Sequence, residues 1–464
     1  ILGLVVGLGV AILGYILVLR DFPKTRKVLG GMVLLGIVVI ALLYNFRESA
    51  FVQKIPAVNR AVETSFTVLK NSPRWFAWES AVSSWKEKPV FGWGPNNFFY
   101  AFNKYYQAES LKFGYGETWF DNAHNILVNT LAVQGAVGLV TYLFIFVAAG
   151  FVLIWARRKN ALDIHAVVIS GAFLAAHLMQ SVTVFENPTS YLYFMFWLAM
   201  VTALTLRSQS VTTIDVKNKN QVVMINRPMG LAGVLVATVT VLLVVFIFNI
   251  QPARANMKAL EALQYLSYQP ETGMEFMKSA LAFNSPHIDD IRGDLSRTAT
   301  SVLSDESNSK FTKEKRLELF SISQQALQAN VELHPYDIRN YLTLSQLSQV
   351  GYTLTGDTKY IADYGSYLDK ALVYSPKRQQ IIYNIANFYL QTGRVDQALK
   401  LLEDTLKESP MVGENYWRLA YVYKFTGKMD KAKEILDLAE KDQVVFNQSQ
   451  QEAIKQILAT TSIK

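Results

Sequence analysis

The sequence predicts an all-helical protein in two parts: a bundle of transmembrane helices with a large external loop, followed by a helical repeat domain. Long apolar runs stop before about residue 250, and amphipathic helical patterns with a polar face fill the rest of the chain. The chain is 51% hydrophobic and only 18% charged, which is unusual for a soluble protein. We therefore expect a membrane domain over residues 1–250, with its loop over 45–125, and a repeat domain over 251–464.

The membrane domain is predicted from the length of its apolar runs, because crossing a bilayer takes roughly 20 apolar residues per helix. The chain starts on Ile1 inside such a run, without a Met or a charged leader, so we expect it to be the C-terminal part of a longer membrane protein. The candidate spans are residues 1–19, 28–44, 126–155, 163–183, 190–206 and 229–250.

The basic residues predict the orientation of these spans. Lys and Arg cluster over residues 20–27, 157–159 and 207–227, and all of these clusters fall on one side if every span crosses once. Cytoplasmic loops carry such an excess of positive charge. We therefore expect the loop 45–125, the short turn containing Glu186 and the domain after residue 250 to be extracytoplasmic.

Charge and cysteine content exclude some classes of function. The net charge of +8 lies largely beside apolar runs, which favours membrane topology and argues against nucleic-acid binding. The chain has no cysteine, so it forms neither disulfides nor thiolate metal sites. We predict no metal site and no cofactor.

The loop 45–125 is rich in aromatic residues and contains a predicted helix. Trp75, Trp78, Val82 and Trp85 recur at helical spacing, which predicts an amphipathic helix that lies in the membrane interface or packs on the bundle. A glycine-rich turn over residues 89–98 follows, and then a dense series of rings. Such rings suit either stacking on sugars or an aromatic belt at the headgroups.

His124 is the candidate catalytic residue, because it directly precedes the predicted helix 126–155. The positive end of a helix disfavours imidazolium, so a neutral imidazole there can act as a base; the alternative is a helix-start cap. The same helix end attracts anionic groups such as phosphate. Arg74 is a candidate clamp for phosphate oxygens, with a solvated surface charge as its alternative.

Two motifs in this region resemble those of the O-antigen ligase and polymerase family, which includes the bacterial O-oligosaccharyltransferases. The first is a histidine and an asparagine, then residues 126–134, then Gly-x-x-Gly; His124, Asn125, Gly135 and Gly138 fill it. The second is an arginine, an aromatic about a turn later, Pro-x-x-Gly-x-Gly and a Phe. Its places are filled by Arg74, Trp78, Pro89, Gly92, Gly94 and Phe98. The resemblance covers roughly residues 30–206, and the usual N-terminal helices of the family are absent.

This resemblance implies a metal-independent transfer of a glycan from undecaprenyl pyrophosphate to a hydroxyl of a sugar or a protein. His124 would activate the acceptor hydroxyl, and Arg74 would hold the pyrophosphate leaving group. The further residues that we expect to contact substrate are Arg47, Arg60, Trp78, Gly94, Asn97, Asp121, Asn122, Asn125 and Glu186.

For several of these residues a structural role is the alternative to a role in the site. Asp121 and Asn122 either orient His124 or cap the helix, and Glu186 either approaches the site or is a solvated turn residue. His177 lies within the span 163–183, where we favour a packed, hydrogen-bonded histidine over a catalytic one.

The C-terminal half contains an internal repeat. The series Tyr383, Ala386, Gly393 and Ala398 recurs in register as Trp417, Ala420, Gly427 and Ala432, with a period of about 34 residues that resembles tetratricopeptide repeats. A degenerate unit precedes them over residues 341–376. Such arrays normally bind a protein partner. Upstream, Asp289, Asp290, Asp294 and Asp305 form an acidic patch, which we interpret as a solvated surface in preference to a metal site.

The sequence therefore favours a multi-pass enzyme of the bacterial cytoplasmic membrane that transfers a lipid-linked glycan to an acceptor glycan or protein. A polymerase of lipid-linked repeat units and a non-catalytic membrane scaffold that presents the repeats are the alternatives. A transporter is less favoured, because the polar residues lie in the loop and not along the spans.

Overall fold

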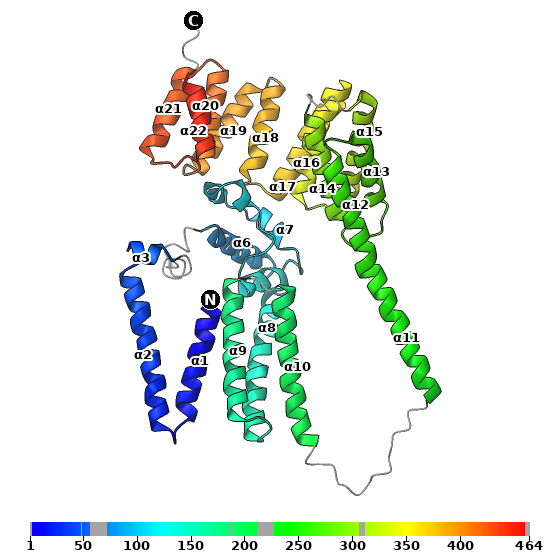
Figure 1. Cartoon of the computed structure of the whole chain (residues 1–464). Helices are drawn as coiled ribbons and strands as arrows, with labels where there is room; N and C mark the ends of the chain where they lie inside the picture. Colours follow the sequence, from blue (N-terminus) through cyan, green and yellow to red (C-terminus); the bar gives the residue numbers. More distant parts are fainter. Residues whose placement is uncertain are drawn as a thin grey trace. The chain divides into compact units, whose positions relative to one another are not determined.

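The structure is a computed structural model that describes residues 2–47, 49–55, 72–184, 187–210, 227–305 and 311–459. All regular elements in these ranges are helices, which confirms the predicted all-helical fold class (Figure 1). The chain forms two compact units, Ile1–Lys219 and Asn220–Lys464, which are described separately here.

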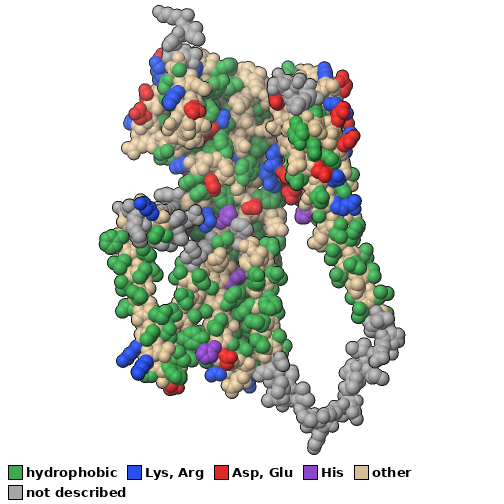
Figure 2. All heavy atoms as spheres, in the orientation of Figure 1, with side chains coloured by type: hydrophobic (Ala, Val, Ile, Leu, Met, Phe, Trp, Pro, Cys, Tyr) green, Lys and Arg blue, Asp and Glu red, His purple; other side chains and the backbone are tan. Residues whose placement is uncertain are grey.

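The first unit contains the predicted membrane spans up to residue 206. Its helices are α1 (Leu2–Val18), α2 (Pro23–Asn45), α3 (Ala50–Gln53), α6 (Pro73–Glu87), α7 (Phe98–Lys104), the 3₁₀ turns η1 (Ala108–Phe113) and η2 (Tyr115–Thr118), α8 (Ile126–Arg158), α9 (Ile164–Thr183) and α10 (Pro188–Ser210). Of these, α2, α8, α9 and α10 are long and apolar enough to cross a membrane, and α1 is a shorter apolar helix. Hydrophobic side chains cover most of their length (Figure 2).

Helices α8, α9 and α10 pack around a shared core. Phe146 and Leu153 of α8 meet Phe194 and Trp197 of α10 in this core. Helix α1 lies against α9 at small residues: a Cβ on Gly7 would come within 2.9 Å of the Ala172 carbonyl oxygen. Because lipid supplies no hydrophobic force between helices, such close backbone approach is the usual way in which membrane helices associate.

The second unit begins with a long helix and continues as an array of helices. Helix α11 (Arg227–Val245) and the short π-helical segment η3 (Phe246–Ile250) lead without a break into α12 (Gln251–Tyr265). A helix over Ala232–Tyr265 is long and apolar enough to span a membrane. The division that we predicted at residue 250 thus falls inside a continuous helical run, and it stays a prediction.

The array consists of antiparallel helices joined by short turns. They are α13 (Pro270–Leu281), α14 (Ile288–Ser304), α15 (Lys313–Leu333), α16 (Ile338–Thr355), α17 (Lys359–Tyr374), α18 (Gln379–Gln391), α19 (Val395–Glu408), α20 (Gly413–Phe425), α21 (Met429–Lys441) and α22 (Gln448–Ala459) (Figure 1). Gly393 and Gly427 end α18 and α20 with φ of 75° and 77°, as the repeat period requires. These helix pairs confirm the predicted repeat domain.

Candidate functional site

The start of α8 carries His124 in a strained backbone conformation. His124 has φ of 52°, a left-handed conformation that costs a residue with a Cβ roughly 1–3 kcal/mol. The side chain of Asn122 supports it, because its Oδ1 accepts the His124 N–H at 2.9 Å. The N-cap of α8 is Asn125, whose Oδ1 accepts the N–H groups of Leu127 and Val128 at 3.0 and 3.3 Å. Asn125 therefore caps the helix, which removes the cap alternative for His124.

The surroundings of His124 favour a neutral imidazole. Burial is the main cause that lowers the pKa of His124, and the Arg74 guanidinium lowers this pKa further. The carboxylates of Asp121 and Glu117 act in the opposite direction and do not reverse the shift. The ring of Phe120 meets the imidazole edge to face, with 5.7 Å between centroids. A half-buried, neutral imidazole beside a fixed positive charge is suited to accept a proton.

Helix α6 brings Arg74 into this environment. Arg74 lies in the first turn of α6, and the indole of Trp78, one turn later, donates a hydrogen bond of 2.8 Å to the carbonyl of Ala123. This bond ties α6 to the residue that precedes His124. The predicted arginine and histidine therefore lie at one site, on the side of the bundle where α8 begins.

The fully buried positions of α6 are small residues, whereas the predicted apolar stripe is only partly buried. Val82 is 38% exposed, and the three tryptophans of the predicted apolar stripe are not fully buried. The residues that pack inward are small, and they recur at helical spacing: Ala77, Ser80, Ala81 and Ser84. The predicted helix is thus present and packs against α7 and α8 through small side chains, which allow a close approach; its position in the membrane interface stays a prediction.

The two glycine motifs interlock and hold α6 and α8 in place. Helix α8 is kinked at Gly135, which has φ of 68° and ψ of −165°. The turn after α6 docks at this kink: the N–H groups of Trp93 and Gly94 donate to the carbonyls of Ala132 and Val133 at 3.0 and 2.8 Å. On the far side of the kink, Ala136 N–H donates to the carbonyl of Pro89 at 2.8 Å. The turn thus satisfies backbone groups that the kink frees.

Side chains at the two central glycines would break this junction. A Cβ on Gly92 would come within 2.5 Å of the Val133 carbonyl carbon, and a Cβ on Gly135 would overlap the Val90 backbone. Both glycines also have positive φ. The glycines of both motifs are therefore required for the packing of this junction, in addition to any contact that the motifs make with substrate.

The remaining predicted site residues occupy different environments. Gly94 and Asn97 belong to the docked turn, where Asn97 Nδ2 donates to the Trp93 carbonyl at 3.0 Å. Arg47 lies after the end of α2, with its guanidinium 4.9 Å from the ring centroid of Tyr44. Arg60 and Glu186 lie outside the described residues. The substrate contacts of all these residues stay predictions.

His177 lies away from this site, within the bundle. It is buried in α9, and its ring stacks on that of Phe194 with 4.2 Å between centroids and 5° between planes. Phe146 and Phe173 stack beside it at 6.2 and 6.1 Å. This environment agrees with the packed histidine that we favoured.

Glu117 and a charged cluster at the end of α6 also contribute to this region, although no sequence motif marks them. Glu117 raises the pKa of His124, but no periodicity or motif singles it out. At the cluster, Glu87 accepts hydrogen bonds from Lys104 and Tyr105 at 2.8 and 2.7 Å, which lowers the pKa of Glu87. Desolvation and this bond raise the pKa of Tyr105 to about 12. The described residues contain no group of three or more His, Asp and Glu side chains arranged to hold a metal ion.

Comparisons with known proteins agree with this division of the chain. Residues 1–143 match a family model described as O-Antigen ligase, so the match begins earlier and ends sooner than the stretch 30–206. Residues 365–420 and 413–441 match models described as tetratricopeptide repeat. A search of curated proteins gave no match.

Solved structures that match the chain include repeat proteins. One is TTC0263, a thermophilic TPR protein in Thermus thermophilus, with 19% identity over 44% of this chain and 99% of that chain and a TM-score of 0.30. Another is MamA protein, with 13% identity over 45% of this chain and 96% of that chain and a TM-score of 0.28. The family matches and the membrane-capable helices together indicate a multi-pass membrane protein that is similar to O-antigen ligases over residues 1–143 and to tetratricopeptide repeats over residues 365–441.

Proposed function

We propose that the protein is a glycosyltransferase that moves a glycan from an undecaprenyl-pyrophosphate carrier to a hydroxyl of a sugar or protein acceptor. The observation that carries this proposal is the placement of Arg74 near His124: the Trp78 indole ties α6 to Ala123 at 2.8 Å, and the Arg74 charge adds to the burial that lowers the pKa of His124. A proton acceptor and an anion clamp are the two groups that transfer from a pyrophosphate ester requires.

The proposed reaction is a single displacement at the anomeric carbon. The acceptor hydroxyl oxygen forms the new bond to this carbon, and its proton passes to the imidazole of His124. The bond between the anomeric carbon and the pyrophosphate oxygen breaks, and the electron pair leaves with undecaprenyl pyrophosphate. Arg74 neutralises the charge that develops on this leaving group through paired N–H donors. The imidazolium later releases its proton to water.

The surrounding loop supports the choice of a lipid-linked donor. The site lies where α8 begins, at the end of a candidate membrane span, so a polyprenyl tail can stay in the lipid while its pyrophosphate reaches Arg74. Exposed rings such as Phe91 and Tyr115, 73% and 41% exposed, are of the kind that stacks on sugars or lies at the headgroups. Under this proposal the loop and the repeats face the outer side of the bacterial cytoplasmic membrane.

The test is a transfer assay in membranes that contain the full-length protein and a lipid-pyrophosphate-linked glycan. Wild type and His124→Ala are compared, and donor and product pools are separated by size. We expect His124→Ala to insert normally, to accumulate donor and to lose product. Unchanged transfer by His124→Ala would contradict this proposal and would favour a non-catalytic scaffold.

The same assay separates ligase from polymerase. A ligase attaches the glycan to an acceptor that lacks the polyprenyl carrier. A polymerase produces a ladder of longer chains that remain on the carrier. Both reactions use the same donor chemistry at His124 and Arg74, so the product, and not the variant, decides between them.

A further inference from the structure

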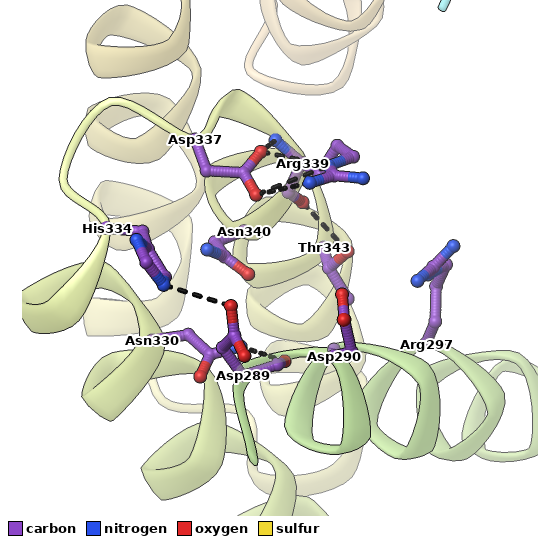
Figure 3. Close-up of a pocket in the computed structure, with 10 residues that line it drawn as sticks. Asp289, Asp290, Arg297, Asn330, His334, Asp337, Arg339, Asn340 and Thr343 are labelled. Carbon is purple, nitrogen blue, oxygen red and sulfur yellow. Dashed lines mark hydrogen bonds and ion pairs between the residues drawn. The ribbon is translucent and has the colours of Figure 1, made fainter. Parts of the chain in front are cut away.

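The repeat unit contains a polar cleft that is separate from the His124 site. Its walls are the N-terminal half of α14, the end of α15 and the start of α16 (Figure 3). The cleft is open to solvent, and its empty volume of about 410 Å³ includes part of that open space. It contains two of the aspartates that the sequence analysis assigned to a solvated acidic patch, Asp289 and Asp290.

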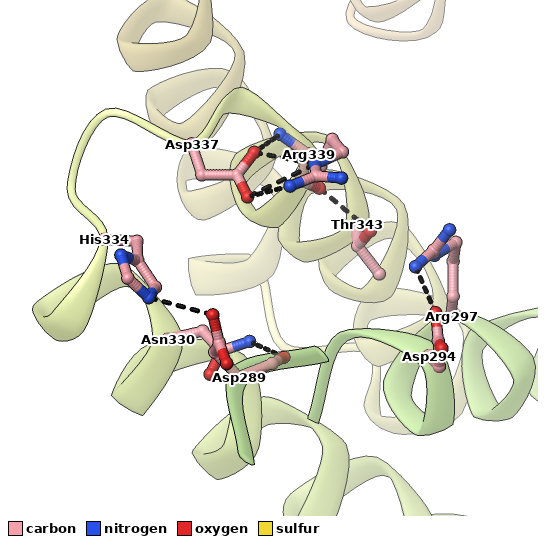
Figure 4. Close-up of polar contacts among 8 residues, drawn as sticks. All are labelled: Asp289, Asp294, Arg297, Asn330, His334, Asp337, Arg339 and Thr343. Atoms are coloured by element: carbon pink, nitrogen blue, oxygen red, sulfur yellow. Dashed lines mark hydrogen bonds and ion pairs between the residues drawn. The ribbon is translucent and has the colours of Figure 1, made fainter. Parts of the chain in front are cut away.

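The arginines of the cleft are neutralised by neighbouring carboxylates. Arg339 pairs with Asp337 through Nη2 at 2.9 Å and through Nε at 3.0 Å, and Arg297 pairs with Asp294 at 2.7 Å (Figure 4). Asp289 pairs with the imidazole of His334 at 2.9 Å. Asp290 forms no ion pair with any described residue. The cleft therefore carries a surplus of negative charge, centred on Asp289 and Asp290.

Asn340 projects into this cleft without a hydrogen-bond partner for its side chain among the described residues. The residue is only 6% exposed, and Figure 3 shows its side chain between His334, Asp289 and Thr343. Its amide therefore has both donors and an acceptor available for a ligand. Asn330 Oδ1, which also lines the cleft, is a buried acceptor without a donor in the described part of the chain.

From this arrangement we infer that the cleft between α14, α15 and α16 binds an extended, basic polypeptide segment. A Lys or Arg side chain of the segment is neutralised by Asp289 and Asp290, and the Asn340 amide pairs with a peptide group of its main chain, donating to the C=O and accepting from the N–H. A negative cleft that offers an amide pair fits this ligand better than a neutral glycan, which needs no cation site. The inference specifies the partner of the repeats within the proposed function, and it is independent of transfer at His124.

Gly293 provides a way to close the cleft without changing its charge. A Cβ on Gly293 would have its nearest neighbours at 3.9 Å, the side-chain nitrogens of Arg297 and Asn330. A larger side chain at this helical position extends into the cleft, and it also favours the helix relative to glycine. Gly293→Leu is therefore an occluding variant that is expected to fold.

The test measures binding of short fluorescent peptides to the full-length protein in detergent by anisotropy. The probes alternate Ser with Lys, Arg, Gln or Glu, and spermidine and a neutral oligosaccharide serve as competitors. We expect the Lys and Arg peptides to bind, and Asp290→Asn to weaken them about twofold to fivefold, as loss of one exposed charge pair does. Gly293→Leu weakens binding on the order of tenfold through a steric clash. Binding weakens as salt rises from about 0.1 M to about 1 M.

The control is Asp404→Asn, which removes an exposed carboxylate that pairs with Lys407 on α19. It should leave peptide binding unchanged. Equal binding by Asp290→Asn and wild type overturns the inference, as does preferential capture of the neutral oligosaccharide. If spermidine binds as tightly as the peptides and Asn340→Ala changes nothing, the cleft is a simple cation site and the polypeptide assignment fails. None of these outcomes depends on the transfer assay.

Discussion

The starts of α8 and α16 are capped in the same way but differ in the backbone strain around them. Each helix is capped by the residue before it: Asn125 accepts N–H groups of α8, and Asp337 accepts the Arg339 N–H at 3.0 Å. Ahead of α8, however, His124 has a left-handed backbone and the helix is kinked at Gly135. The backbone ahead of α16 has no such strain. Strain thus lies beside the proposed chemistry, whereas none of the residues that line the repeat cleft has a positive φ.

The largest expected effect comes from breaking the junction between the two glycine motifs. Gly135→Ala forces a Cβ against the Val90 backbone at a position with positive φ, so we expect a loss of roughly 2–5 kcal/mol in the free energy of unfolding. Thermal unfolding in detergent measures it. Gly150→Ala is the matched control, because Gly150 lies in the same helix with open space around it. Equal stability of the two variants would mean that the interlocked turn does not position the site.

The next effect concerns Arg74 and the pH dependence of transfer. Removal of its charge in Arg74→Gln should reduce transfer by about 10²–10³-fold, the usual cost of one lost donor to a developing anion. It also takes away a cation that lowers the pKa of His124, so this pKa rises. Transfer requires neutral imidazole and falls as pH drops through that pKa, so the acidic limb of the profile moves to higher pH.

Arg74→Lys is the control for that shift, because it keeps the positive charge and loses the paired donors. Its acidic limb should stay closer to that of the wild type, although its rate falls. If the acidic limb of the pH profile lies at the same pH in Arg74→Gln as in the wild type, Arg74 does not influence the pKa of His124.

A smaller effect is expected at the helix cap. Asn125→Ala leaves two N–H groups of α8 without their acceptor, which typically costs about 1 kcal/mol of stability. Asn125→Asp keeps an acceptor and should restore most of it. Thermal unfolding compares the two, and a cost as large as that of Gly135→Ala would show that Asn125 has a role beyond capping.

Much of the fold was predictable because apolar length and repeat period are direct sequence signals. The spans, the helix of the loop and the repeats follow from them, and the place of His124 just before a helix follows from the apolar run that begins at Ile126. The conformation of His124 was not predictable, because its φ depends on the Asn122 side chain. The inward face of α6 consists of small residues such as Ala77 and Ala81, which the spacing of the tryptophans does not single out.

The polar cleft of the repeats was less accessible to sequence reasoning. Asp289 and Asp290 stood out as acidic, but His334 lies far along the chain and meets Asp289 only when α14 and α15 pack. Nothing in the sequence separates Asn340 from other polar residues of the array, since its significance lies in where the packed helices place it. Contacts between helices, and not local patterns, define this cleft.

The most direct test of the central claim compares stability and transfer in His124→Asn. Asparagine adopts left-handed φ more readily than histidine, so this variant should unfold at an equal or higher temperature. It lacks a base, so transfer from the lipid-linked donor should fall by about 10²–10⁴-fold, the typical contribution of a general base. Full transfer by a stable His124→Asn protein, or loss of transfer together with loss of stability, would contradict the assignment of His124 as the catalytic base.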